Sequence, residues 1–168
     1  WTGALSAQNV QINPSPSDVS VTPAFGNPSG TIDLNTNFWG TASNVISWSW
    51  KRARGYFDVV AYTGTGSATT VTHNLGVAPE MMWIKCRDAS ENGPVYHKGL
   101  DGGTNPETHY IRLNQNNAEA DSSDWWNDTA PTASVFTVGT QGQVNTNNKN
   151  YIAYLFATVA GVSKVGSF

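Results

Sequence analysis

Apolar residues recur along this chain in short runs that are separated by turn residues. Four runs have the length of a β-strand and occupy residues 56–62, 69–72, 81–86 and 95–97. Runs of this kind, with Gly, Pro, Asn and Ser between them, are typical of a β-meander. The turn Gly64-Thr65-Gly66 supplies positions that tolerate positive φ, so we expect residues 57–63 and 69–73 to pair as an antiparallel hairpin. Residues 81–84 are all apolar, which suits a strand covered on both faces.

Three later segments are also predicted to be strands, namely residues 108–113, 134–138 and 151–162. In the last one, Ile152, Leu155 and Phe156 fit helical spacing, but apolar residues fill its other faces too. Its aromatic and β-branched content favours a buried strand. The pattern of residues 162–168 echoes that of residues 56–62, so we expect a further strand that pairs with another chain or continues beyond residue 168.

The N-terminal part of the chain differs from the rest. Residues 1–44 contain four prolines among Asn, Ser and Gly, which predicts an irregular arm with short extended pieces, or the end of a preceding domain. Residues 45–50 are then predicted to be a strand with Ile46, Trp48 and Trp50 on one face. Such rings pack on the sandwich or on a second subunit, or, if exposed, form a platform that stacks on sugars. The predicted fold is therefore all-β, an antiparallel β-sandwich over residues 45–168 preceded by the irregular arm.

Composition narrows the class of protein. A chain of 168 residues is long enough for one domain with a substantial core. Only 12% of its residues are charged and the net charge is −3, which argues against nucleic-acid binding because that requires a basic surface. The longest apolar run, residues 151–162, is too short to span a bilayer, so we expect no membrane insertion. The single cysteine, Cys86, lies in a predicted strand and is interpreted as a small buried hydrophobe.

Residues with catalytic chemistry are present, but no spacing marks an active site. The histidines His73, His97 and His109 show no metal-binding spacing. The carboxylates Asp58 and Glu80 are not marked as the pair that glycoside hydrolysis needs. Asp58 interrupts an apolar strand, so we expect a structural partner for it in one of two basic residues, Arg54 or Lys85. The sequence predicts a protein without catalytic residues or a cofactor.

An acidic segment surrounds two adjacent tryptophans, Trp125 and Trp126. Its carboxylates are Glu119, Asp121, Asp124 and Asp128. Oxygen ligands suit calcium, but the spacing is not that of an EF-hand loop. Residues 119–128 are therefore either a calcium site or part of a long surface loop whose tryptophans tuck back onto the sheet.

Several long motifs resemble a known type of protein. They are FDVVAYTGTG, TVTHNLGVAPEMMWIK, VYHKGL, WNDTAPTASVFTVG and YIAYLFATVAGVSKVGSF. From about residue 50 to residue 168 the chain resembles a repeated domain of tail-fibre and tail-spike virion proteins, common in marine phages. The resemblance implies a jelly-roll or lectin-like β-sandwich on a virion appendage, a homotrimer, and synthesis in the host cytoplasm followed by display on the virion surface.

The first functional hypothesis is an attachment module that contacts other virion proteins and binds a host-surface glycan. Loops at the end of a sandwich offer recognition surfaces on a rigid scaffold. The loops predicted to bind the glycan are residues 90–94, 101–107 and 115–128. Their candidate ligand-binding residues are Trp125, Trp126, Asn127, Asn92 and Asn105. The alternatives are a capsid decoration or connector that binds only virion proteins, and a depolymerase that cleaves host polysaccharide.

Overall fold

A computed structural model describes residues 50 and 52–166, and these residues form a mostly β structure. Its elements in chain order are β1 (Phe57–Thr63), β2 (Thr69–Thr72), β3 (Met81–Cys86), β4 (Pro94–His97), the 3₁₀ turns η1 (Leu100–Gly103) and η2 (Pro106–Thr108), β5 (His109–Arg112), β6 (Ala120–Asp121), α2 (Ser123–Trp126), β7 (Val135–Val138), α3 (Gly142–Asn145) and β8 (Asn150–Phe156). The predicted arm over residues 1–44 and all but the last residue of the predicted strand 45–50 lie outside the described residues.

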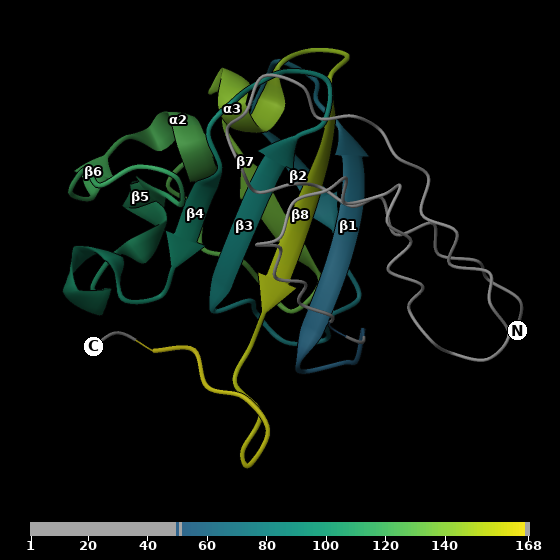
Figure 1. Ribbon diagram of the computed structural model, residues 1–168, viewed down its shortest axis with the longest axis vertical. Helices are drawn as coiled ribbons and strands as arrows, with labels where there is room; N and C mark the ends of the chain where they lie inside the picture. Colours follow the sequence, from purple (N-terminus) through teal and green to yellow (C-terminus); the bar gives the residue numbers. More distant parts are fainter. Residues whose placement is uncertain (1–49, 51, 167–168) are drawn as a thin grey trace, which may run out of the picture.

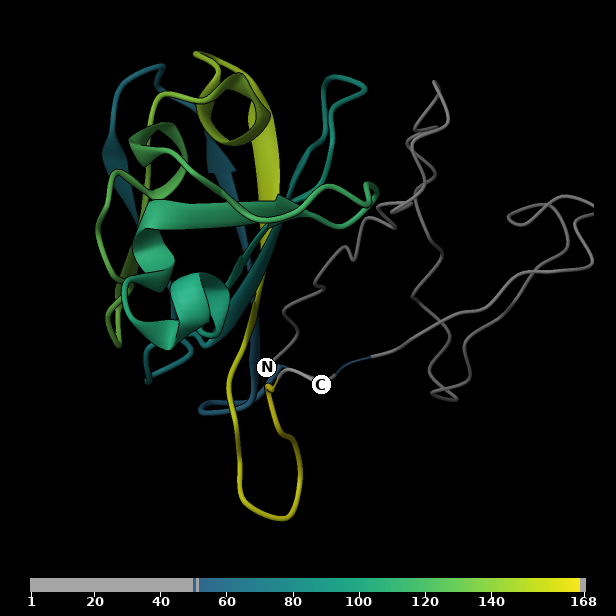
Figure 2. The same ribbon diagram turned by 90° about the vertical axis from the view of Figure 1, so that its left-hand side faces the viewer.

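Two antiparallel sheets make up the fold (Figure 1). The large sheet has six strands in the order β1-β8-β3-β4-β5-β6, and the small sheet pairs β2 with β7. The sheets lie in separate layers, as the rotated view shows (Figure 2). The prediction of an all-β antiparallel sandwich is confirmed. The predicted meander of residues 56–97 is wrong in its pairing, because of its four runs only the last two, β3 and β4, pair with each other.

The predicted hairpin between residues 57–63 and 69–73 is wrong. β1 pairs with β8 instead, with Phe57 opposite Phe156, while β2 pairs with β7. The glycines between β1 and β2 serve another purpose, because they bring the chain against the segment after α3. A Cβ on Gly64 would lie 2.2 Å from the carbonyl oxygen of Thr146. The N–H groups of Gly64 and Gly66 donate to the carbonyls of Lys149 and Asn145.

The hydrophobic core lies between the two sheets. In β3 and β8 every second residue points into it, among them Met82 and Ile84 from β3 and Leu155 from β8, each at most 1% exposed. Phe136 of β7 meets them from the small sheet and is fully buried. Cys86 belongs to the same core at 1% exposure, which confirms its interpretation as a buried hydrophobe.

β8 ends at Phe156, earlier than the predicted strand 151–162. The chain then reverses in a turn in which the N–H of Val159 donates to the carbonyl of Ser163. This turn projects beyond the end of the sandwich (Figures 1 and 2). The expected strand at residues 162–168 is therefore not seen in the part that is described, which ends at residue 166.

Candidate binding site

The large sheet has a second apolar face, which points away from the small sheet; we call it the outer face. In an antiparallel pair, residues directly opposite each other project to the same side. The register aligns one such row across five strands, made of Val59, Tyr154, Trp83, Val95 and Ile111. A neighbouring row contains Phe57, Phe156, Met81 and His97. Both rows are largely apolar, so the sheet is hydrophobic on both sides.

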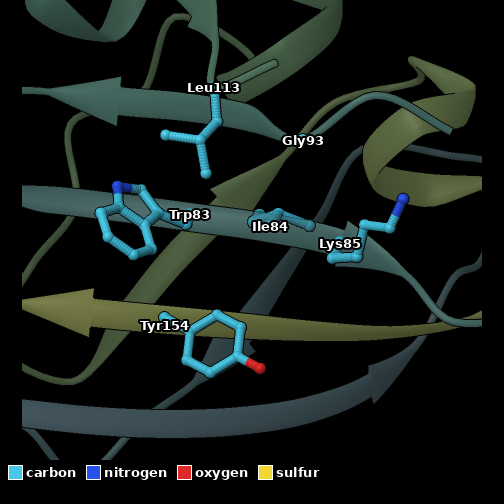
Figure 3. Close-up of a pocket in the computed structure, with 6 residues that line it drawn as sticks. All are labelled: Trp83, Ile84, Lys85, Gly93, Leu113 and Tyr154. Carbon is cyan, nitrogen blue, oxygen red and sulfur yellow. The ribbon is translucent and has the colours of Figure 1, made fainter. Parts of the chain in front are cut away.

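A shallow pocket opens on the outer face (Figure 3). It is a small hollow of about 20 Å³ and is lined by Trp83, Ile84, Lys85, Gly93, Leu113 and Tyr154. The rings of Trp83 and Tyr154 come from neighbouring strands and are half-buried. Leu113 follows β5 and is 43% exposed. The pocket is therefore an aromatic surface with an aliphatic wall, open to solvent.

Each aromatic ring of the pocket is held by further rings. The Trp83 indole contacts Phe156 with centroids 4.8 Å apart, and the Tyr154 phenol stacks on Phe57 with centroids 6.5 Å apart. Burial raises the pKa of Tyr154 to about 12, although the nearby charge of Arg87 opposes the shift. The Tyr154 hydroxyl therefore keeps its proton at physiological pH and can donate a hydrogen bond to a ligand.

Polar groups form one rim of the pocket. The Nδ2 of Asn114 donates to Asn92 Oδ1 at 2.9 Å, and Asn114 Oδ1 accepts from the N–H of Gly93 at 3.1 Å. Lys85 is 8% exposed, and its ammonium donates to the carbonyl of Glu91 at 2.7 Å. These bonds fix the loop between β3 and β4 beside the pocket. Asn92, predicted to bind ligand, thus stands next to a pocket residue and is half-buried.

Trp125 and Trp126 do not form a stacking platform, and the prediction of ligand contact through their rings is wrong for this structure. Each is 1% exposed. Trp126 donates from Nε1 to the carbonyl of His109 at 2.9 Å, and Trp125 stacks on Tyr110. The alternative, in which both rings tuck back onto the sheet, is confirmed. They belong to the short helix α2, whose N-cap Ser122 accepts from the N–H of Asp124.

Asn127 and Asn105 are exposed, but they lie outside the pocket lining. Asn127 ends α2 in the left-handed conformation with φ of 53°, a position that asparagine tolerates well. Asn105 donates from its backbone and side chain to Asp101 Oδ2, and the N–H of Asp101 donates to Glu119 Oε2. Within the described residues, no group of three His, Cys, Asp or Glu side chains could hold a metal ion.

The buried carboxylate of Asp58 has structural partners. Asp58, 2% exposed, accepts from the guanidinium of Arg52 and from the backbone N–H groups of Val59 and Asn74. The prediction of Arg54 or Lys85 as its partner is therefore wrong. The sequence offers no signal for this choice, because Arg52, Arg54 and Lys85 are all basic and only the turn at residues 53–56 brings Arg52 to Asp58.

Of the six residues that line the pocket, only Gly93 lies in a loop predicted to bind ligand. Sequence reasoning missed the other five, Trp83, Ile84, Lys85, Leu113 and Tyr154. A signal existed for Trp83, since residues 81–84 are apolar at consecutive positions. The pairing of β3 with β8, which brings Tyr154 beside Trp83, is a contact between distant parts of the chain and has no local pattern.

The described residues thus define an antiparallel β-sandwich domain with an aromatic pocket on the outer face of its large sheet. By a match over residues 24–168 the chain belongs to a family described as a domain of unknown function, DUF7483. Neither a curated protein nor a solved structure matches it. In the described part of the chain, the helices are too short to cross a membrane.

Proposed function

We propose that this domain is a non-catalytic attachment module that binds a glycan in the outer-face pocket. The observation that carries the proposal is the pairing of Trp83 and Tyr154, two half-buried rings side by side on the outer face. The Trp50 ring packs edge-on against Trp83, with centroids 6.3 Å apart. A pyranose ring has an apolar face of C–H groups and an edge of hydroxyls. Such a ligand fits an aromatic surface that is bordered by hydrogen-bonding groups.

The rim supplies the polar part of this recognition. The Tyr154 hydroxyl offers a donor, and the amide of Asn92 and the backbone near Gly93 lie along one side. These groups are held by hydrogen bonds and packing before a ligand arrives, which lowers the entropy lost on binding. A weak but specific interaction with a sugar is the expected result.

The pocket favours binding over hydrolysis. Glycoside hydrolysis requires two carboxylic groups that flank the scissile bond. The pocket-lining residues include no Asp or Glu, and their one charged side chain is Lys85. We therefore propose attachment rather than depolymerisation.

We further propose that the module acts on a phage virion appendage, where it contacts other virion proteins and a host-surface glycan. The support is the resemblance of residues 50–168 to tail-fibre and tail-spike domains. A surface that is poor in charge and rich in Asn, Thr, Ser and Gly agrees with this setting.

Binding of the full chain to a panel of bacterial surface polysaccharides and oligosaccharides tests the proposal. Leu113→Asp places a charge in the pocket wall and should abolish binding. Val77→Asp is the matched control, because Val77 is 41% exposed and does not line the pocket. Tyr154→Phe removes one hydroxyl and should weaken binding about 2- to 13-fold, the range expected for a neutral hydrogen bond. Equal binding by wild type and Leu113→Asp would refute the site, and release of new reducing ends would refute the non-catalytic part.

A structural connector that binds only other virion proteins is the second candidate. It is favoured by the breadth of the outer face, where apolar side chains extend well beyond the pocket. Absence of binding to every glycan in the panel, together with retention of the fold, would favour the connector.

A further inference from the structure

The chain contains one Asn-Gly pair, and it borders the outer-face pocket. Asn92 and Gly93 lie in the loop between β3 and β4, are both half-buried, and Gly93 lines the pocket. An asparagine followed by glycine is especially prone to spontaneous deamidation. The reason is that glycine has no Cβ to hinder the approach of its nitrogen to the asparagine side chain.

Deamidation at this pair passes through a cyclic imide. The backbone nitrogen of Gly93 loses its proton and attacks Cγ of Asn92, and the Cγ–Nδ2 bond breaks. The departing NH₂ group takes up a proton and leaves as ammonia. Water then opens the succinimide ring at either carbonyl, which gives aspartate at position 92 or its isomer, in which the main chain runs through Cγ. One water is consumed, one ammonia is released, and a carboxylate replaces the amide.

The side chain of Asn114 holds both reacting groups. Its Oδ1 accepts from the N–H of Gly93 at 3.1 Å, and its Nδ2 donates to Asn92 Oδ1 at 2.9 Å. The carbonyl of Gly93 in turn accepts from the N–H of Leu113 at 2.8 Å. Removal of the Gly93 proton breaks the first bond and leaves two lone pairs facing each other. The other two bonds resist the rotations that carry the Gly93 nitrogen to Cγ.

We propose that Asn92 is a deamidation site and that Asn114 sets the rate of the reaction. While the contacts of Asn114 are closed, the pair is protected; when they open, Asn92 converts. Asn114 acts as a positioning residue, because it forms no bond to the reacting atoms at any step. This proposal does not depend on glycan binding.

The product changes the charge beside the pocket. A carboxylate at position 92 lowers the formal net charge of −3 by one further unit. The Nδ2 of Asn114 can donate to it as it does to the amide oxygen. The new charge also stands next to Glu91, whose backbone carbonyl accepts from the Lys85 ammonium at 2.7 Å. The isomer adds one atom to the main chain immediately before β4 and disturbs the start of that strand.

Mass spectrometry of the full chain tests the proposal. Folded chain and chain unfolded in guanidinium chloride are incubated in mildly alkaline buffer, and peptide sequencing locates each conversion of Asn to Asp. In the unfolded chain, Asn92 should convert faster than every other asparagine, and folding should slow it. In the folded chain, Asn114→Ala should speed conversion of Asn92 about 2- to 13-fold, the range expected for loss of one neutral hydrogen bond. Conversion of the other asparagines should not change.

Two further variants separate the causes. Asn114→Asp keeps an acceptor for the N–H of Gly93 and should convert no faster than wild type. Asn117→Ala is the matched control, because Asn117 is an exposed asparagine of the same segment, and it should leave the rate at Asn92 unchanged. Amide hydrogen exchange at Gly93 should be faster in Asn114→Ala and unchanged in Asn117→Ala.

Three results would overturn the proposal. The first is an equal rate at Asn92 in folded and unfolded wild type. The second is an Asn114→Ala chain that converts no faster than wild type, or that converts faster at all asparagines alike. The third is equal acceleration in Asn114→Ala and Asn114→Asp, which would show that the bond to the Gly93 N–H does not protect the pair.

Discussion

The phenol ring of Tyr110 lies on the indole ring of Trp125, with centroids 4.0 Å apart and planes inclined by 22°. The Arg112 guanidinium lies 5.0 Å from the first ring and 5.2 Å from the second. This contact joins α2 to β5 and holds Trp125, which lies in an acidic, polar segment, in the interior.

Trp125→Ala should lower the free energy of unfolding by about 3–5 kcal/mol, because it removes a large buried ring and its stacking contact with Tyr110. The exposed position Ser123 in the same helix is the control, and Ser123→Ala should change it by less than about 0.5 kcal/mol. Denaturant unfolding followed by circular dichroism measures both. The milder Trp125→Phe should leave glycan binding unchanged; a loss of binding in a stable variant would mean that the ring contacts the ligand.

Asn145 connects the start of the β1–β2 loop to α3. Its side chain is fully buried, donates to the carbonyls of Ser67 and Gly139, and accepts from the N–H of Thr65. Asn145→Ala removes three hydrogen bonds to backbone groups, of which only the Ser67 carbonyl keeps a second donor, Thr65 Oγ1, and it should lower the free energy of unfolding by about 3 kcal/mol. The same change at the exposed Asn147 should have little effect. Comparable losses at both positions would show that the buried network is not the cause.

His73 predicts a pH dependence of stability. Its Nδ1 accepts from the N–H of Leu75, so its Nε2 carries the hydrogen that faces the carbonyl of Thr132. Burial lowers the pKa of His73, and the bond to Thr132 and the charge of Asp58 oppose this only in part. Because the folded pKa lies below the unfolded value of about 6.5, the unfolded chain binds more protons. Stability due to His73 is full above that pH and falls as the pH drops from there towards the folded pKa.

Thermal unfolding at a series of pH values between 8 and 5 measures this effect. His73→Gln should be less stable at pH 8 but should lose less stability than wild type on acidification. An identical slope in the two proteins would assign the pH dependence to other groups.

Gly139 allows a close approach between β7 and α2. A Cβ at this position would lie 2.3 Å from the carbonyl oxygen of Asp124, a backbone atom that cannot rotate away. Gly139→Ala should therefore cost at least about 3 kcal/mol of stability, the upper end of typical overpacking penalties. Gly93→Ala is the matched control, since its Cβ would meet only ordinary contacts beginning at 3.7 Å. A stable Gly139→Ala protein would require a shift of α2, which amide hydrogen exchange would detect.

The strands were predictable from sequence where local pattern decides them. β3 was predicted with its observed limits, and β4, β5 and β7 to within one residue at each end, because alternation and flanking turn residues act over short distances. The pairing of β1 with β8 was not predictable, since it joins Phe57 to Phe156 across most of the domain. The local pattern around Gly64 predicts a hairpin, whereas in the structure this glycine allows a close contact with the chain near Thr146.

The candidate site was predictable only in part. Loop composition predicts Asn92, which lies beside the pocket, whereas aromatic character predicts Trp125 and Trp126, which are buried. Both tryptophans lie in a single helical turn, which is too short for a periodic sequence pattern to reveal that they are buried. The pairing of Trp83 with Tyr154 depends on sheet order, and sheet order is a property of the whole chain.

The central position of β8 has a consequence for synthesis. On the ribosome, β1 and β3 emerge well before residues 150–156, which must later insert between them. Until then both strands expose unsatisfied backbone edges and apolar side chains, a state prone to association with other nascent chains. Closure of the sheet is therefore a late, post-emergence event, and chaperone holding until residues 150–156 have emerged should raise the yield of folded protein.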